Sequence, residues 1–200
     1  FDHESNFRRL VGPVGMLVTT IAVVLSGFHI YTAGFGLLVE IKHRAFHLAL
    51  VLGLIFLVFP RPNPATDRRG IAREWGWALL FGTFYLYLAW DLIASLTRTG
   101  ELKNGWPFMA FVAFVVLITL PIKRFGGYGD KPSWIDWPLA LLAAGVSLYL
   151  VVFFDDIFIT RVGSPIAQDY MTRVVAIIIV MESTRRTMGP LLPLISMACL

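Results

Sequence analysis

Long apolar runs limit how this chain can fold more than any other feature of its sequence. Residues Leu10–Tyr31 form one such run, and about 20 mostly apolar residues are enough for a helix to cross a bilayer. Hydrophobic residues make up 57% of the chain and charged residues only 15%, which is more apolar than a soluble domain. The sequence therefore predicts an all-α, polytopic membrane protein.

Six apolar runs reach or approach spanning length, and we expect each to form a transmembrane helix. The second run reaches that length if its helix begins near Ile41, and the sixth if it extends over Ala167–Thr187. The apolar residues after Pro190 are expected to begin a seventh span, so that the 200 residues would be a fragment. The six runs cover about residues 10–31, 45–59, 75–96, 106–120, 134–154 and 170–181.

The distribution of Lys and Arg predicts which helix ends face the cytoplasm. Connections on the side of the N-terminus hold nearly twice as many of these residues as the connections on the other side. Positive charge favours the cytoplasmic side, so the N-terminus is predicted to lie inside. The inner set is Arg8, Arg9, Arg61, Arg68, Arg69, Arg73, Lys123, Arg124, Lys131, Arg185 and Arg186, and the outer set is Lys42, Arg44, Arg98, Lys103, Arg161 and Arg173.

The net charge of +4 does not indicate a nucleic acid partner, because the basic residues are spread through short connections and form no stripe.

Charged residues mostly lie near the ends of the apolar runs, since a charge at the bilayer centre costs at least about 2.5 kcal/mol. Glu182 and Arg186 are four residues apart, which predicts an ion pair on one helical face beside Arg185. Interfacial solvation and local pairing account for these charges.

The histidines offer one alternative function. His43 and His47 share a helical face, and His29 precedes a turn into the same outer region. Histidines on two helices can hold a haem, so an electron carrier using His29 and His47 is possible in principle. There is no HExxH motif and only one cysteine, Cys199, so we expect neither metal nor cofactor in this region.

Motifs for catalysis are absent from the sequence. It contains no P-loop, no GxSxG, no credible Ser-His-Asp set and no GxGxxG after a strand, so an enzyme is not expected. The chain also lacks the paired, interrupted apolar segments that are typical of a transporter's own substrate site. A membrane-embedded enzyme, an independent channel and a helical membrane protein of unrelated role are the remaining alternatives.

Two separated blocks carry the most specific patterns in the chain. Glu40–Pro60 reads EIKHRAFHLALVLGLIFLVFP. Asp136–Asp169 begins DWPLALLA and contains the loop RVGSP, and it is followed at Val180–Ser196 by VMESTRRTMGPLLPLIS. The first block resembles the R-A-x-H-L segment that opens the second helix in the fused permeases of TRAP transporters, notably the TAXI type. The second resembles the region just before their large domain.

The resemblance implies a division of the chain and a set of partners. Residues 1–186 would be the small-subunit-like membrane scaffold, and residues 187–200 would begin the large permease domain. That domain would carry small organic acids and sodium, and a periplasmic binding protein would deliver the substrate. The bilayer of a bacterial or archaeal cytoplasmic membrane would surround the chain.

The sequence also departs from the family pattern and offers candidate interface residues. The two runs within about residues 74–121 form an additional helix pair, and an even number of added spans preserves the sidedness of everything downstream. No catalytic or substrate-binding residue follows from the resemblance. The structural or interface candidates are Arg44 and His47 at one interface, and Glu182, Arg185 and Arg186 at the other.

Overall fold

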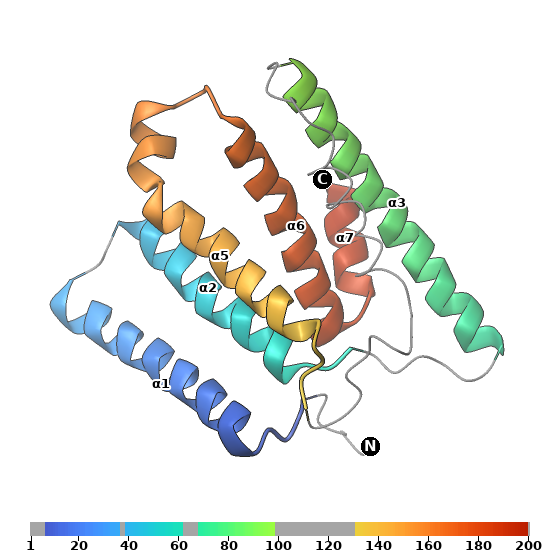
Figure 1. Cartoon of the computed structure of the whole chain (residues 1–200), viewed down its shortest axis with the longest axis horizontal. Coiled ribbons are helices and arrows are strands. Elements are labelled where there is room, and N and C mark those ends of the chain that lie inside the picture. The colour runs from blue at the N-terminus through green and yellow to red at the C-terminus, as the bar shows by residue number, and fades with distance from the viewer. Residues whose placement is uncertain (1–6, 37–38, 62–67, 99–130, 200) are drawn as a thin grey trace. The chain divides into compact units, whose positions relative to one another are not determined.

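The computed structural model describes residues 7–36, 39–61, 68–98 and 131–199, and these residues form an all-α protein, as predicted. The chain divides into two units, the first containing α1, α2, α5 and η2 and the second containing α3, α6 and α7. The elements in chain order are α1 (Gly12–Phe35), α2 (Glu40–Val58), α3 (Arg68–Arg98), α5 (Asp136–Val152), the π-helix η2 (Asp156–Thr160), α6 (Ala167–Met188) and α7 (Leu191–Cys199) (Figure 1).

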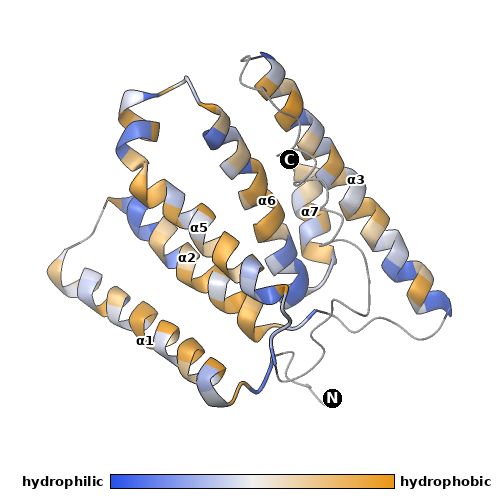
Figure 2. Cartoon of the chain, viewed as in Figure 1, coloured by the Kyte–Doolittle hydropathy of each residue, from blue (hydrophilic) through white to orange (hydrophobic). Residues whose placement is uncertain are grey.

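Three of the described helices, α1, α2 and α3, are long and apolar enough to cross a membrane. The predicted count of six spans is therefore wrong for the described residues. Helix α5 is apolar but has only 17 residues, and α7, at the predicted start of a seventh span, has 9. Helix α6 has 22 residues, but the charged residues near its two ends leave a short apolar middle (Figure 2). The predicted span at 106–120 lies outside the described residues.

In the first unit, α2 packs against α5 through small residues. Ala49 of α2 and Ala143 of α5 are 2% and 0% exposed. A Cβ atom added to Gly53 would lie 3.7 Å from the carbonyl oxygen of Ala140, so the two helix backbones approach closely there. Small residues at such contacts are typical of helices in lipid, where burial of apolar side chains does not drive helix association. Larger buried side chains, Leu52, Phe56 and Leu139, flank this contact.

Helices α2 and α5 run antiparallel. Lys42 near the start of α2 lies 3.6 Å from Asp155, which follows α5. The Lys42 ammonium also lies 4.8 Å from the centre of the Phe154 ring, a distance suited to a cation–π contact. The start of α2 and the end of α5 are therefore joined.

Helix α1 packs on α2 but buries little of its own surface. The Phe28 ring lies 4.6 Å from the Phe46 ring of α2, and among the α1 residues only Thr32 is buried. The hydroxyl of Thr32 donates to the carbonyl oxygen of Phe28 in its own helix at 2.9 Å, so the polar group is satisfied locally. An apolar helix with this little coverage is suited to direct contact with lipid.

In the second unit, α3 and α6 run antiparallel. Asp91 in the second half of α3 lies 3.3 Å from Arg173 near the start of α6. Helix α6 ends at Met188 and is followed by Gly189, whose φ of 81° is a backbone conformation that favours glycine at a helix end. One helical stripe of α3 is buried, and it consists of Phe81, Tyr85, Ala89, Leu92 and Leu96.

The close contact at Gly53 is testable by substitution. Gly53→Leu is expected to destabilise the protein by about 1–3 kcal/mol, because the larger side chain must displace the α5 backbone. Gly53→Ala is the matched control, since its Cβ would make an ordinary contact at 3.7 Å. Thermal unfolding of the purified protein in detergent, followed by circular dichroism, measures both effects. A leucine variant that unfolds at the wild-type temperature would contradict the close approach of the helices.

Candidate functional site

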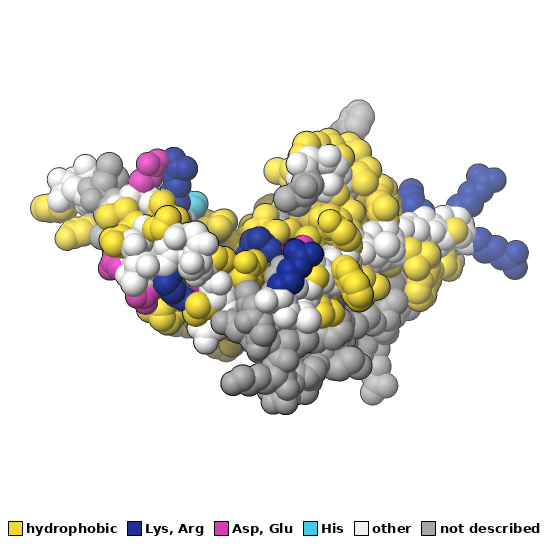
Figure 3. All heavy atoms as spheres, turned by 90° about the horizontal axis from the view of Figure 1, so that it is seen from above, with side chains coloured by type: hydrophobic (Ala, Val, Ile, Leu, Met, Phe, Trp, Pro, Cys, Tyr) yellow, Lys and Arg dark blue, Asp and Glu magenta, His cyan; other side chains and the backbone are white. Residues whose placement is uncertain are grey.

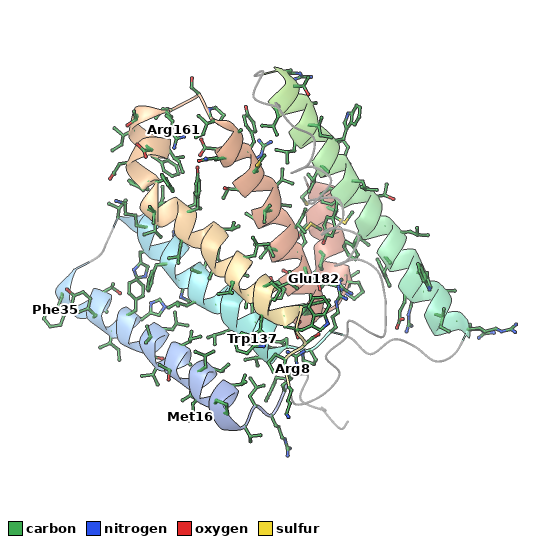
Figure 4. All side chains as sticks on the ribbon, in the orientation of Figure 1. Arg8, Met16, Phe35, Trp137, Arg161 and Glu182 are labelled. Carbon is green, nitrogen blue, oxygen red and sulfur yellow. The ribbon has the colours of Figure 1, made fainter. Side chains whose placement is uncertain are left out.

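A buried ion pair joins the segment before α1 to the start of α5. The Nη2 atom of Arg8 lies 2.7 Å from Oδ2 of Asp136, and the two side chains are 1% and 3% exposed. Nη1 of Arg8 donates to the carbonyl oxygen of Leu57 at 2.9 Å, and the backbone N–H of Arg8 donates to that of Val58 at 2.9 Å. We call these four residues the arginine clasp. It connects the N-terminal segment, the end of α2 and the start of α5 (Figure 4).

The helix ends favour both charges of the arginine clasp. The last carbonyl groups of a helix lack partners within the helix and carry partial negative charge, so the end of α2 stabilises the Arg8 guanidinium. The first turn of α5 carries partial positive charge, which stabilises the Asp136 carboxylate. Oδ2 of Asp136 also accepts a hydrogen bond from the backbone N–H of Ser133 at 2.8 Å. The pair is neutral and well hydrogen-bonded, which offsets the cost of burying two charges.

Sequence reasoning missed the arginine clasp. Arg8 contributed only to the prediction of sidedness, and Asp136 appeared only as the first residue of the DWPLALLA block. An acidic residue in the first turn of an apolar helix was the available signal, because such residues favour a helix start. Its partner lies 128 positions away in the chain, and no local pattern specifies a contact at that distance.

A second buried charge cluster lies near the end of α6 (Figure 4). Glu182 accepts hydrogen bonds from Nε and Nη2 of Arg185 at 2.8 and 2.9 Å, and from Nε of Arg186 at 3.0 Å. The Glu182 and Arg186 side chains are 2% and 0% exposed, whereas Arg185 is 23% exposed. The pair between Glu182 and Arg186 is the one that their spacing predicts, and Arg185 adds a two-pronged contact. We call these three residues the α6 charge cluster.

The α6 charge cluster faces α3 within the second unit. Tyr85 of α3 is 1% exposed and lies near the Glu182 carboxylate. Glu74, nearly two turns into α3, lies near the Arg185 guanidinium. The arginines lie in the last turn of α6, where the helix dipole favours positive charge. The cluster therefore lies where the end of α6 packs on the first half and the middle of α3.

The structure gives different surroundings to Arg44 and His47, which were predicted to share one interface. The Arg44 side chain is 76% exposed and pairs with Glu40, one turn earlier in the same helix. His47 instead contacts α1, where its Nδ1 lies 2.7 Å from Nε2 of His29. The His43 ring lies 5.5 Å from the His29 ring. The three histidines thus form part of the contact between α1 and α2.

This contact does not fit the haem alternative. A metal–imidazole bond is about 2.0 Å long, so the nitrogens of two histidines on opposite sides of an iron lie about 4 Å apart. The separation of 2.7 Å between His29 and His47 is that of a direct hydrogen bond. In the described ranges, no three His, Cys, Asp or Glu side chains gather in a way that could hold a metal ion.

The chain matches no protein-family model, no curated protein and no solved structure. The two sequence blocks described above, Glu40–Pro60 and the block that begins at Asp136, lie at the helix contacts of the structure. Both blocks contribute to these contacts: Glu40–Pro60 supplies the carbonyl groups of the arginine clasp, and the later block supplies Asp136 and the α6 charge cluster.

Breaking the arginine clasp is expected to destabilise the protein strongly. Arg8→Gln leaves the Asp136 carboxylate buried beside a neutral partner, which costs about 3–5 kcal/mol for a buried pair. The matched control is Arg44→Gln, which removes an exposed arginine–carboxylate pair and should cost about 1 kcal/mol or less. Thermal unfolding in detergent compares the two variants. Equal losses of stability would show that the clasp contributes no more than a surface pair.

The α6 charge cluster allows a second test by a double-mutant cycle. Glu182→Gln leaves two arginines side by side with one of them fully buried, so we expect a loss of about 3 kcal/mol. Arg186→Met in the same chain removes the buried charge and should restore part of that stability. Urea unfolding in detergent gives the four stabilities of the cycle. Strictly additive effects would mean that Glu182 and Arg186 do not stabilise each other.

Proposed function

We propose that this chain is the membrane scaffold of a sodium-coupled, binding-protein-dependent TRAP permease for small organic acids. The proposal locates it in the cytoplasmic membrane of a bacterium or archaeon, as a multi-pass protein with its N-terminus inside. One observation supports this function above the others. Asp136 and Glu182 of the second block make buried contacts that hold helix ends together, and the first block supplies the carbonyl groups that accept from Arg8.

A scaffold requires helices that keep their positions while a partner domain moves against them. The arginine clasp joins three chain segments at one end of the first unit, and Lys42 joins α2 to Asp155 at the other end. In the second unit, the α6 charge cluster and the pair between Asp91 and Arg173 stand at opposite ends of the contact between α3 and α6. These charges are engaged with one another, which supports a structural role over a role in substrate binding.

The partners of the scaffold follow from the same proposal. A large permease domain, in cis if the protein is fused, would carry the substrate and the sodium ions. A periplasmic binding protein would deliver the substrate to that domain. This chain would anchor the assembly in the bilayer through its apolar helices, of which α1 has the least coverage by the rest of the described protein.

The genetic context tests the proposal directly. We expect a large hydrophobic permease domain to be encoded in frame after Leu200 or by an adjacent gene, with a secreted binding protein encoded nearby. Sequencing several hundred codons beyond the Leu200 codon, together with the neighbouring genes, provides the measurement. A stop codon immediately after Leu200 with no large permease gene alongside would contradict the proposal.

Transport in liposomes gives an independent test. The chain alone is expected to catalyse no uptake of organic acids, whereas the chain with the large domain and the binding protein should catalyse uptake driven by a sodium gradient. Arg8→Gln should lower that rate because it loosens the scaffold, and Arg98→Gln, at an exposed helix end, is the matched control. Uptake by the chain alone would contradict the scaffold function.

A further inference from the structure

The first two turns of α3 carry arginines that take no part in the packing of the second unit. Arg68, Arg69 and Arg73 are all exposed. Within the part of the chain that the structure describes, none of the three pairs with an acidic side chain. Arg69 and Arg73 are four residues apart, so they share a helical face on which like charges repel. In Figure 3, dark blue side chains project from the start of α3 at the right of the view.

The stability of α3 does not account for these arginines. Acidic residues, not basic ones, are favourable near a helix start, because the first turn carries partial positive charge. Helix α3 has no acidic residue in its first turn. Glu74 is the nearest acidic residue within the helix, and its charge acts on Arg185 of α6. These three exposed guanidinium groups are therefore accessible to a negative group outside the helix.

The length of α3 brings these arginines to the depth of lipid headgroups. Its 31 residues extend over about 46 Å at 1.5 Å per residue, which exceeds the hydrocarbon thickness of about 30 Å. Trp75 and Trp77 mark the interface, because tryptophan favours the headgroup level. About 20 residues after Trp77 are enough to cross the hydrocarbon. Arg73 then lies about 3 Å and Arg69 about 9 Å beyond Trp75 along the helix axis.

The neighbouring helix end adds to the positive charge. Arg185 and Arg186 lie in the last turn of α6, and the action of Glu74 on Arg185 shows that this end lies close to the start of α3. Glu182 carries one negative charge and pairs with both Arg185 and Arg186. The α6 charge cluster therefore carries a net positive charge. Clusters of basic residues next to a membrane-crossing helix attract anionic lipid headgroups.

We propose that the start of α3 binds the phosphate groups of anionic phospholipids, with Arg69 and Arg73 as the central pair and Arg68 beside them. A guanidinium group can donate two parallel hydrogen bonds to a phosphate, and a bound phosphate removes the repulsion between Arg69 and Arg73. This inference goes beyond the proposed function, because it requires only that α3 crosses the bilayer. It gives a role to a helix of the additional pair, for which the family resemblance supplies none.

Native mass spectrometry of the full chain in detergent micelles tests the proposal. Titration with phosphatidylglycerol or phosphatidylcholine gives a dissociation constant for each bound lipid. We expect phosphatidylglycerol to bind more tightly. The affinity of the tightest phosphatidylglycerol site should fall roughly fivefold for each guanidinium group removed. The variants are Arg73→Gln and the triple variant Arg68→Gln/Arg69→Gln/Arg73→Gln. Unchanged affinity in the triple variant would overturn the proposal.

Two controls separate a specific site from a loss of folding or a general charge effect. The triple variant with lysine at the same three positions keeps the charge and should retain most of the preference for phosphatidylglycerol. Arg98→Gln removes one exposed arginine at the opposite end of the same helix and should leave the tightest site unchanged. If Arg98→Gln weakens that site as much as Arg73→Gln does, the start of α3 is not the binding site.

A competition experiment distinguishes a lipid from a soluble phosphate. Inorganic phosphate is added to the complex with phosphatidylglycerol, and chloride is added to a parallel sample at the same ionic strength, because salt alone screens exposed charges. We expect the two salts to displace the same amount of lipid. Greater displacement by inorganic phosphate would assign the site to a soluble phosphate and overturn the lipid proposal.

Discussion

The ion pair between Arg8 and Asp136 is the contact on which the first unit depends. Small residues bring α2 and α5 together, and the larger buried side chains of Leu52, Phe56 and Leu139 flank that contact. The arginine clasp holds the end of α2 beside the start of α5. We infer that the clasp sets the register of the pair, a role for which buried charges are well suited.

Both units place their charges according to the same physical constraint. An isolated charge in lipid is unfavourable, and the buried charges of this protein lie at helix ends beside partners of opposite sign. Asp136 lies at the start of α5, and the arginines of the α6 charge cluster lie at the end of α6. The helix dipole stabilises each charge in its position. The buried ion pairs of the arginine clasp and the α6 charge cluster hold these helix ends in place.

Helices α1 and α3 differ in the side chains that they leave exposed. Helix α1 is apolar around most of its circumference and is anchored mainly by its aromatic and histidine contacts with α2. Helix α3 has a buried stripe on one face and an arginine-rich start beyond its interfacial tryptophans. A scaffold that is anchored through an apolar helix and a charged helix end would resist both rotation and displacement along the membrane normal.

The sequence by itself determined the all-α class, because long apolar runs with few charges leave little choice of secondary structure. It also determined the ion pair between Glu182 and Arg186, since residues four apart in a helix are neighbours. The number of spans was overestimated, because charged residues near the ends of α6 and the short length of α5 left less apolar helix than the runs suggested. Only the tertiary structure decided that Arg8 meets Asp136 and that His47 makes a direct hydrogen bond with His29. Such contacts between distant segments depend on how helices pack, and a local sequence pattern does not specify that packing.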